Sequence, residues 1–210
     1  MKKIAIYGAG GLGRETALLI QQINMHSNKW ELLGFFDDGL KKGEKVNNWT
    51  VIGGMDEVAK VDSPLDLVVA IADSQARMRV VEKIYNRIIE FPTLVHPTCL
   101  RGDGNNTFGN GCILSAGVIL TTGISLGKFT IVNLQTTIGH DVKMGAFVTV
   151  MPGCSISGNV QIGPGSMIGT GARILQNLRL GSLCKVGAGA VVTSSFTDGK
   201  IIVGIPAHEK

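Results

Sequence analysis

Residues 106–195 divide into sixes without a gap: NTFGNG, CILSAG, VILTTG, ISLGKF, TIVNLQ, TTIGHD, VKMGAF, VTVMPG, CSISGN, VQIGPG, SMIGTG, ARILQN, LRLGSL, CKVGAG and AVVTSS. The third position of all 15 hexads is Phe, Leu, Val, Ile or Met. The first position is mostly small or β-branched, and all 16 glycines of the segment fall at position four, five or six. This six-residue register decides the fold.

A prism of short strands explains the register. Positions one and three are two residues apart, so on a strand they share one face, and their apolar character predicts that this face is buried. Glycine supplies the bends, where a positive φ is needed and a Cβ would clash. Three walls make one coil, and the five coils that 15 hexads provide, spaced by about 4.8 Å, give a rod of roughly 24 Å. A β-sandwich does not hold such a register over this length.

Two further expectations follow from the hexads. Three cysteines, Cys112, Cys154 and Cys184, occupy first positions, so we interpret them as small core residues. Position two points outward, and several of its residues are apolar. They include Ile113, Ile119 and Ile131. Because exposed apolar surfaces usually mark interfaces, we expect a closed assembly of several chains.

A glycine-rich loop between a strand and a helix opens the chain. Residues 3–7 (KIAIY) are a short β-rich run, residues 8–13 (GAGGLG) contain four glycines, and residues 14–25 have helical character. Such glycines let a diphosphate approach the backbone and meet the helix N-terminus. Strand, glycine loop and helix are the start of a Rossmann-type unit.

Two acids follow the next strand of this unit. The strand is expected over residues 32–36 and ends at Asp37 and Asp38, which can accept hydrogen bonds from a ribose or a base. A third apolar run covers residues 67–72, and a helix is expected over residues 77–89. The pattern predicts nucleotide binding, and a structural tight turn without a ligand is the alternative.

Nicotinamide-dependent oxidoreduction is a rival interpretation of the glycine loop. A first half of about 90 residues leaves no separate substrate domain for hydride transfer, because the rest of the chain forms the β-helix. Arg77 opens the second predicted helix. Its side chain either meets a phosphate or is an ordinary solvated helix charge.

His140 is the histidine whose position best suits chemistry. The chain has 4 histidines, and His140 stands at position five of its hexad, in a bend, where it points away from the core. Imidazole can accept a proton near neutral pH. Acyl transfer from a thioester needs a base that takes a proton from the attacking hydroxyl or amine. Asp141 could hold the imidazole and stabilise its charged form, and an exposed histidine without a role is the alternative.

Composition argues against several classes of function. The net charge is +4, from 20 basic and 16 acidic residues, and no basic run exceeds two, whereas nucleic-acid binding usually shows a clustered basic stripe. No apolar stretch approaches the roughly 18 residues needed to span a bilayer, and the N-terminus lacks a signal-peptide pattern. We therefore expect a cytoplasmic protein with reduced cysteines. No metal-binding spacing occurs, so we expect no metal.

The chain resembles bacterial hexapeptide-repeat sugar acyltransferases of the sialic acid O-acetyltransferase and UDP-4-amino-sugar N-acetyltransferase type. The resemblance rests on YGAGGLGRE (residues 7–15), FFDD (35–38), LVHP (94–97), IGHD (138–141), ISGNVQIG (156–163) and VGIPA (203–207). It implies a left-handed parallel β-helix and a homotrimer. It also implies a Rossmann-like nucleotide-sugar-binding domain over residues 1–92, a junction over 93–105, the β-helix acyltransferase domain over 106–195 and a C-terminal tail over 196–210.

The same resemblance implies roles for individual residues. His140 would be the general base, and Asp141 would raise its basicity. The nucleotide sugar would be held by Gly10, Gly11, Leu12, Asp37, Asp38 and Ala72. Acetyl-CoA, the co-substrate, would lie near Thr149, Gly158, Thr170 and Ala188. Some amino-sugar enzymes of this type carry histidines where this chain has Leu12 and Thr149, so the resemblance does not specify the sugar.

We therefore expect an acetyl-CoA-dependent acetyltransferase that modifies an amino or hydroxyl group of a nucleotide-linked sugar in bacterial surface-glycan biosynthesis. One alternative is a sialic acid O-acetyltransferase. The other is a trimeric scaffold that binds nucleotide sugars without catalysis. Thioester consumption with release of CoA would separate the enzymes from the scaffold, because a scaffold binds ligands without turnover.

Overall fold

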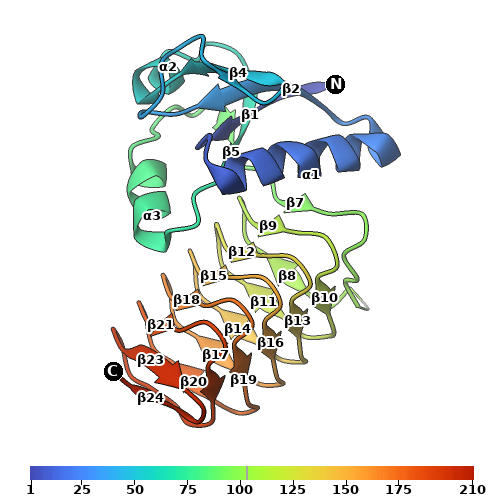
Figure 1. Cartoon of the computed structure of the whole chain (residues 1–210). Helices are drawn as coiled ribbons and strands as arrows, with labels where there is room; N and C mark the ends of the chain where they lie inside the picture. Colours follow the sequence, from blue (N-terminus) through green and yellow to red (C-terminus); the bar gives the residue numbers. More distant parts are fainter. Residues whose placement is uncertain (103) are drawn as a thin grey trace. The chain divides into compact units, whose positions relative to one another are not determined.

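The computed structural model describes residues 1–102 and 104–210, which divide into two compact units, Met1–Leu94 and Val95–Lys210. The first unit is an α/β sheet domain, and the second is a stack of short parallel strands (Figure 1). The fold class expected from the sequence, an α/β domain followed by a parallel β-helix, is thus confirmed. No helix among the described residues has the length and apolar character needed to cross a membrane.

The first unit contains one six-stranded sheet with the order β3-β4-β2-β1-β5-β6. All of its strand pairs are parallel except β3 with β4. The elements are β1 Lys2–Tyr7, α1 Gly11–Ser27, β2 Trp30–Phe36, β3 Lys45–Val46, β4 Trp49–Gly53, α2 Met55–Ala59, β5 Leu65–Val69, α3 Ser74–Glu82 and β6 Ile89–Glu90. Every residue of β5 is buried, as is typical of a parallel strand covered on both faces.

The helix boundaries differ from the sequence expectation. Helix α1 begins at Gly11, before the expected Arg14, because the Arg14 N–H already donates to the Gly10 carbonyl at 3.1 Å. Helix α3 ends at Glu82, so the expectation that this helix continues to residue 89 was wrong. The Asn86 side chain accounts for this, since it donates to the Val61 carbonyl at 2.7 Å and accepts from the Ile88 N–H. Such side-chain bonds to the backbone compete with a helix.

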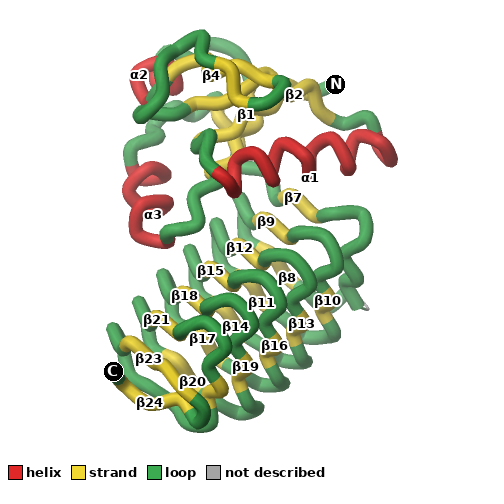
Figure 2. The backbone as a smooth tube through the Cα atoms, viewed as in Figure 1, coloured by secondary structure: helices red, strands yellow, loops and turns green. Residues whose placement is uncertain are grey.

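Three parallel sheets form the walls of the second unit, with the yellow strands in register along the stack (Figure 2). Wall 1 has the order β20-β17-β14-β11-β8, wall 2 contains β21-β18-β15-β12-β9, and wall 3 has the order β10-β13-β16-β19-β22. The strands are β8 Thr107–Phe108, β9 Ile113–Leu114, β10 Ile119–Leu120, β11 Ser125–Leu126, β12 Ile131–Val132, β13 Thr137–Ile138, β14 Lys143–Met144, β15 Thr149–Val150, β16 Ser155–Ile156, β17 Gln161–Ile162, β18 Met167–Ile168, β19 Arg173–Ile174, β20 Arg179–Leu180, β21 Lys185–Val186 and β22 Val191–Val192. Each strand therefore covers positions two and three of one hexad.

The interior of the second unit follows the hexad register. Third-position side chains are buried in every hexad except the first, where Phe108 is half-buried. Cys112, Cys154 and Cys184 are at most 1% exposed and form no disulfide. The interpretation of these cysteines as small core residues is confirmed.

The bends use glycine for two separate reasons. From residue 111 to residue 189, the sixth position of every hexad has positive φ. Glycine occupies half of these positions, and residues such as Asp141 at φ 61° and Asn159 at φ 56° occupy the others. Fourth-position glycines are instead required by close packing, since a Cβ on Gly139 would lie 2.7 Å from the Gly158 nitrogen in the next coil. Both reasons given at the sequence level, positive φ and steric clash, are confirmed.

The exposure of the apolar residues at the second hexad position was predicted correctly only in part. Ile119 is 40% exposed, as expected, but Ile113 and Ile131 are 1% exposed, so the expectation that they would be exposed was wrong. Both lie on wall 2. The hexad pattern determines which way a side chain leaves its coil, and it does not determine how exposed that side chain is.

Two short segments extend the β-helix beyond the hexads. Before them, β7 Leu94–Val95 pairs within the sheet of wall 2, and Leu100 bridges to Ile119. After them, β23 Ile201–Gly204 adds to β21 in parallel, and β24 Ala207–Glu209 returns antiparallel beside β23. The tail therefore continues wall 2 at the C-terminal end of the stack.

Candidate functional site

The first unit has a topological switch point beside β1. The chain passes from β1 to β2 on one side and later to β5 on the other. In open parallel sheets, ligands bind outside the carboxyl ends of the strands at such a point. Three segments begin there: the glycine loop after β1, Asp37 and Asp38 after β2, and the turn over residues 70–73 after β5.

The glycines of the loop have different functions. A Cβ on Gly13 would overlap the Gly8 carbonyl, so Gly13 permits the close approach of α1 to the loop. A Cβ on Gly10 or Gly11 would meet nothing within 4 Å, and both residues are exposed. Leu12 follows in the first turn of α1 and is half-buried. Gly10 and Gly11 therefore leave open space in front of the helix N-terminus, where an anionic group would be stabilised.

The two acids after β2 point to different partners. Asp37 accepts hydrogen bonds at 2.8 Å from the N–H groups of Ala9, in the glycine loop, and of Gly39. Asp38 accepts from the Tyr7 hydroxyl and from the Met55 N–H. Burial, and then the hydrogen bond to Asp38, raise the pKa of Tyr7, so its hydroxyl stays protonated as a donor. The structure thus brings Asp37, rather than Asp38, to the glycine loop.

A hollow of about 290 Å³ lies beside these acids. Its lining includes Asp37, Asp38, Lys42 and Glu57, with Lys42 at 3.9 Å from Glu57. It is open to the hydroxyl groups of a ribose or the polar edge of a base, both of which donate to carboxylates.

The turn after β5 is held by Arg77, whose surroundings were predicted wrongly from the sequence. Ala72 is half-buried in this turn, beyond the end of β5, although the sequence pattern placed it in the strand. Arg77 is fully buried, and its Nη1 donates to the carbonyls of Ile71 and Ala72. Both expectations for Arg77, a phosphate ligand or a solvated charge, were therefore wrong. Its type and position in the sequence do not reveal that two main-chain carbonyls surround it.

In the second unit, His140 and Asp141 form a pair at one corner of the β-helix. We call the bends between wall 3 and wall 1 the His140 corner; it comprises residues 121–123, 139–141, 157–159 and 175–177. His140 Nδ1 lies 2.9 Å from Asp141 Oδ2, and the two side chains are 63% and 64% exposed. With Nδ1 held by the carboxylate, Nε2 is the nitrogen that can accept a proton.

Two glycines of neighbouring coils make room for this pair. A Cβ on Gly158 would lie 2.6 Å from His140 Cε1 and 2.9 Å from Cδ2. A Cβ on Gly123 would lie 2.7 Å from Asp141 Oδ1. The imidazole therefore lies directly over Gly158, and the carboxylate lies beside Gly123. The sequence-based assignment gave Gly158 to acetyl-CoA and did not single out Gly123. A signal was available in the hexads, because Gly158 has the same hexad position as His140, and Gly123 the same as Asp141, each one coil away.

The residues expected to contact acetyl-CoA do not converge within one chain. Gly158 lies at the His140 corner, whereas Thr170 and Ala188 lie exposed at the bends between wall 2 and wall 3. Thr149 is on wall 2 and is fully buried. A ligand that touches His140 and Ala188 together must reach two different edges of the prism.

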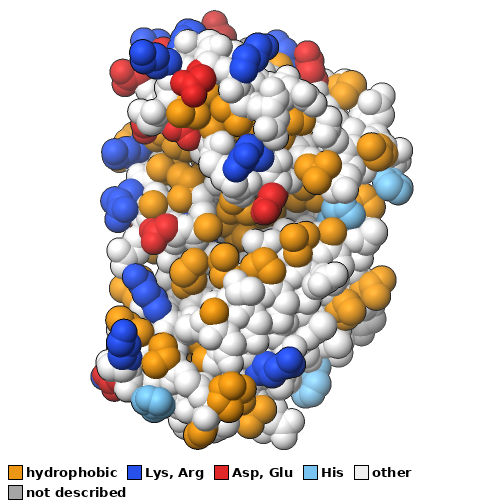
Figure 3. Space-filling model, viewed as in Figure 1, with side chains coloured by type: hydrophobic (Ala, Val, Ile, Leu, Met, Phe, Trp, Pro, Cys, Tyr) orange, Lys and Arg blue, Asp and Glu red, His pale blue; other side chains and the backbone are white. Residues whose placement is uncertain are grey.

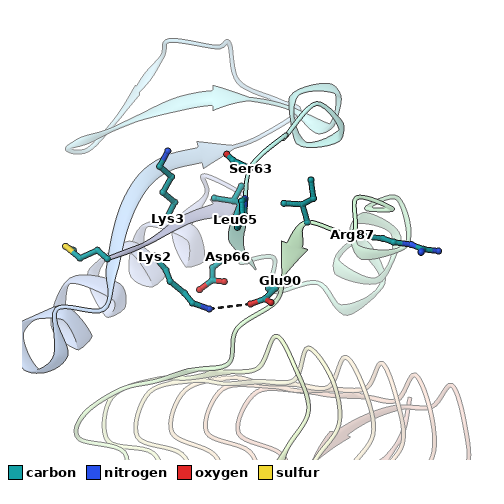
Figure 4. Close-up of a pocket in the computed structure, with 10 residues that line it drawn as sticks. Lys2, Lys3, Ser63, Leu65, Asp66, Arg87 and Glu90 are labelled. Atoms are coloured by element: carbon teal, nitrogen blue, oxygen red, sulfur yellow. Dashed lines mark ion pairs between the residues drawn. The ribbon is translucent and has the colours of Figure 1, made fainter.

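The larger hollow of the first unit contains none of the expected site residues. It measures about 650 Å³ and lies at the amino ends of β1 and β5, where Lys2 and Glu90 pair at 3.5 Å (Figure 4). The carboxyl ends of the strands are the usual ligand side, so we do not assign this hollow to a substrate.

Among residues 1–102 and 104–210, no three His, Cys, Asp or Glu side chains converge as metal ligands.

Surface charge on the visible face is mixed. Lys and Arg side chains are scattered there among Asp and Glu side chains and do not form one continuous stripe (Figure 3). A nucleic-acid backbone usually meets a clustered basic surface. This face therefore lacks the electrostatic pattern of a nucleic-acid site.

Two family models match separate parts of the chain. Residues 3–84 match the PglD N-terminal domain, and residues 141–176 match the bacterial transferase hexapeptide (six repeats). The GDP-perosamine N-acetyltransferase of Escherichia coli O157:H7 is 35% identical over 142 residues, which are 67% of this chain and 63% of that protein. The match therefore leaves more than a third of that relative's length uncovered.

Two solved structures are similar along the whole chain. The acetyltransferase domain of PglB from Neisseria gonorrhoeae FA1090, in complex with acetyl coenzyme A, is 33% identical, with a TM-score of 0.90 and coverage of 100% of this chain and 99% of that chain. WeeI from Acinetobacter baumannii AYE is 32% identical, with a TM-score of 0.91 and full coverage of both chains.

Proposed function

This chain belongs to the hexapeptide-repeat sugar acyltransferases, and we propose that it transfers the acetyl group of acetyl-CoA to the amino group of a nucleotide-linked amino sugar. The observation that carries the proposal is the His140–Asp141 pair, seated over Gly158 on a β-helix corner. An amine is favoured over a hydroxyl because the relative from Escherichia coli O157:H7 is an N-acetyltransferase.

In the proposed reaction, the neutral sugar amine attacks the thioester carbonyl carbon. A C–N bond forms as the C–S bond breaks, and CoA leaves as the free thiol once its sulfur is protonated. Nε2 of His140 takes the proton from the attacking nitrogen and passes it to the departing sulfur, while Asp141 stabilises the imidazolium. The nucleotide sugar would be held by Gly10, Gly11, Leu12, Asp37, Asp38 and Ala72. Acetyl-CoA would be held near Thr149, Gly158, Thr170 and Ala188.

The setting of the reaction is part of the proposal. We place it in the biosynthesis of a bacterial surface glycan, in the cytoplasm. All four cysteines are buried free thiols, the state expected of cysteines in a reducing compartment.

The direct test is acetyl transfer with candidate acceptors. We expect release of CoA from acetyl-CoA in the presence of GDP-linked or UDP-linked amino sugars, measured as free thiol. Transfer to free or CMP-linked sialic acid alone would favour the O-acetyltransferase. Binding of nucleotide sugars without release of CoA would favour the scaffold and contradict the proposed activity.

A second prediction separates the two ligands. Gly11→Val should weaken nucleotide-sugar binding about tenfold or more, because its side chain would fill open space in front of the loop. Asp37→Ala should also weaken it, because the Ala9 N–H loses its acceptor. Acetyl-CoA affinity should stay unchanged in both variants. The measurement is titration calorimetry with each ligand. Binding of nicotinamide dinucleotides in place of sugar nucleotides would show that the first unit has been misassigned.

A third prediction concerns assembly. We expect a homotrimer with each active site between two chains, because the proposed acetyl-CoA contacts lie on two different edges of one β-helix. Light scattering should report about 67 kDa, three times the 22.2 kDa of the chain. A stable monomer at micromolar concentration would contradict it.

Subunit mixing tests the shared site directly. His140→Ala and Ala188→Trp should each be inactive alone. After unfolding and refolding of an equimolar mixture, about a quarter of the sites of a randomly mixed trimer would combine an intact His140 corner with an intact Ala188 edge. We expect the mixture to recover about a quarter of the wild-type activity. If each site were built within a single chain, the mixture would recover no activity.

A further inference from the structure

The turn between β5 and α3 lies between a buried cation and solvent. Arg77, in α3, is 0% exposed, whereas Ala72 in the turn is half-buried and Asp73 is exposed. The guanidinium donates to the carbonyl oxygens of Ile71 and Ala72, the latter at 3.2 Å. The carbonyls of Ile71 and Ala72 therefore both point toward the Arg77 side chain.

Peptide geometry then fixes the direction of two N–H groups. In a trans peptide, the C=O and the following N–H point in opposite directions. Because the Ile71 and Ala72 carbonyls point to Arg77, the N–H groups of Ala72 and Asp73 point away from it, and Asp73 is exposed. Among the described residues, the Asp73 N–H donates to no acceptor.

The turn borders the glycine loop. A Cβ on Gly8 would lie 3.0 Å from the Ala70 oxygen and 3.3 Å from Ile71 Cγ1. The Ala70 N–H donates to the Tyr7 carbonyl at 2.8 Å. Asp37 fixes the loop from the β2 side through Ala9, and Arg77 fixes the neighbouring turn on the β5 side.

We propose that Arg77 is a positioning residue for the nucleotide-sugar site, and that the turn it holds presents the Asp73 N–H as a hydrogen-bond donor to an oxygen of the nucleotide sugar. The proposal deepens the proposed function and rests on it for the identity of the ligand. Arg77 acts through the backbone and does not touch the substrate.

Asp73 allows the N–H to be removed with a matched control. Its φ of −64° suits proline, and its side chain caps α3 by accepting from the Ala76 N–H at 2.7 Å. Asp73→Ala loses only the cap, whereas Asp73→Pro loses the cap and the N–H. We expect the Kd for GDP-perosamine or a UDP-linked amino sugar to be about tenfold higher in Asp73→Pro than in Asp73→Ala. The Kd for acetyl-CoA should be equal in the two.

Arg77 is tested with Arg79 as its control, because Arg79 is exposed on the same helix. Arg77→Lys retains the charge but cannot present the planar guanidinium, so the KM for the nucleotide sugar should rise about tenfold. The kcat at saturation and the KM for acetyl-CoA should stay within about twofold of wild type. Arg79→Lys should behave as wild type in all three.

Several outcomes would overturn this role. Equal sugar-nucleotide Kd values in Asp73→Ala and Asp73→Pro would exclude the N–H contact. A parallel loss of affinity for both ligands in Arg77→Lys, or its failure to fold, would show that Arg77 only supports the fold. Failure of the proposed function would give a different result, because wild type would then bind the nucleotide sugar without releasing CoA. The comparison of Kd values between Asp73→Ala and Asp73→Pro would still decide whether the N–H contacts the nucleotide sugar.

Discussion

Replacing His140 with alanine should lower kcat by about 10²- to 10⁴-fold, the usual contribution of a positioned general base. The side chain is 63% exposed, so its removal leaves no buried cavity, and the stability should change by no more than about 0.5 kcal/mol. The KM for acetyl-CoA should change much less than kcat, because the base acts in the transition state. Steady-state kinetics at matched acceptor saturation, together with a thermal melt, would measure both effects.

Asp141 provides the graded control for this experiment. Its backbone has φ 61°, a conformation that asparagine also adopts readily. Asp141→Asn therefore keeps the bend and a side-chain oxygen near Nδ1, and removes only the charge that stabilises the imidazolium. Its loss in kcat should be smaller than that of His140→Ala. Full activity of a correctly folded His140→Ala variant would contradict the proposed mechanism and leave His140 an exposed bend residue without a catalytic role.

Gly158→Ala is expected to reduce kcat about 10²-fold, the effect of displacing a catalytic group by about 1 Å. The added Cβ would lie 2.6 Å from His140 Cε1, so the imidazole must swing away. The exposed ring can move at little cost in stability, and Gly158 has no positive φ. The melting temperature should therefore remain close to that of wild type while activity falls.

Gln176→Ala is the matched control for Gly158→Ala. Gln176 stands at the fifth hexad position of the same corner, one coil further along, and is exposed. This variant should keep wild-type kcat. A second comparison uses Gly158→Ala in the His140→Ala background, where the ring is absent and the added methyl should cost little further activity. An additional loss as large as that in wild type would mean that Gly158 acts on acetyl-CoA directly and not through His140.

The sequence by itself determined the β-helix and its interior. The hexads identified every strand from β8 to β22, the buried first and third positions, and the bends with positive φ. They also placed His140 in a bend next to Asp141, where the two side chains pair at 2.9 Å. These features could be predicted because each depends on the conformation of a few consecutive residues and on a period that repeats along the chain.

The sequence also predicts a nucleotide-sugar site at the switch point, through the glycine loop and the acids after β2. It could not separate Asp37, which contacts the loop, from Asp38, which contacts Tyr7 and Met55. Adjacent strand-end residues point in different directions, and their partners come from segments far along the chain.

Only the tertiary structure decided the remaining features. Arg77 is buried and holds the β5–α3 turn, Ile113 and Ile131 are buried, and Gly158 lies under the His140 ring. The positions of Arg77 and Gly158 depend on contacts between segments that the local pattern does not relate: a carbonyl facing a guanidinium, and a ring over the backbone one coil away. Periodicity specifies which way a side chain leaves its own strand or bend, and packing in three dimensions specifies what it then meets.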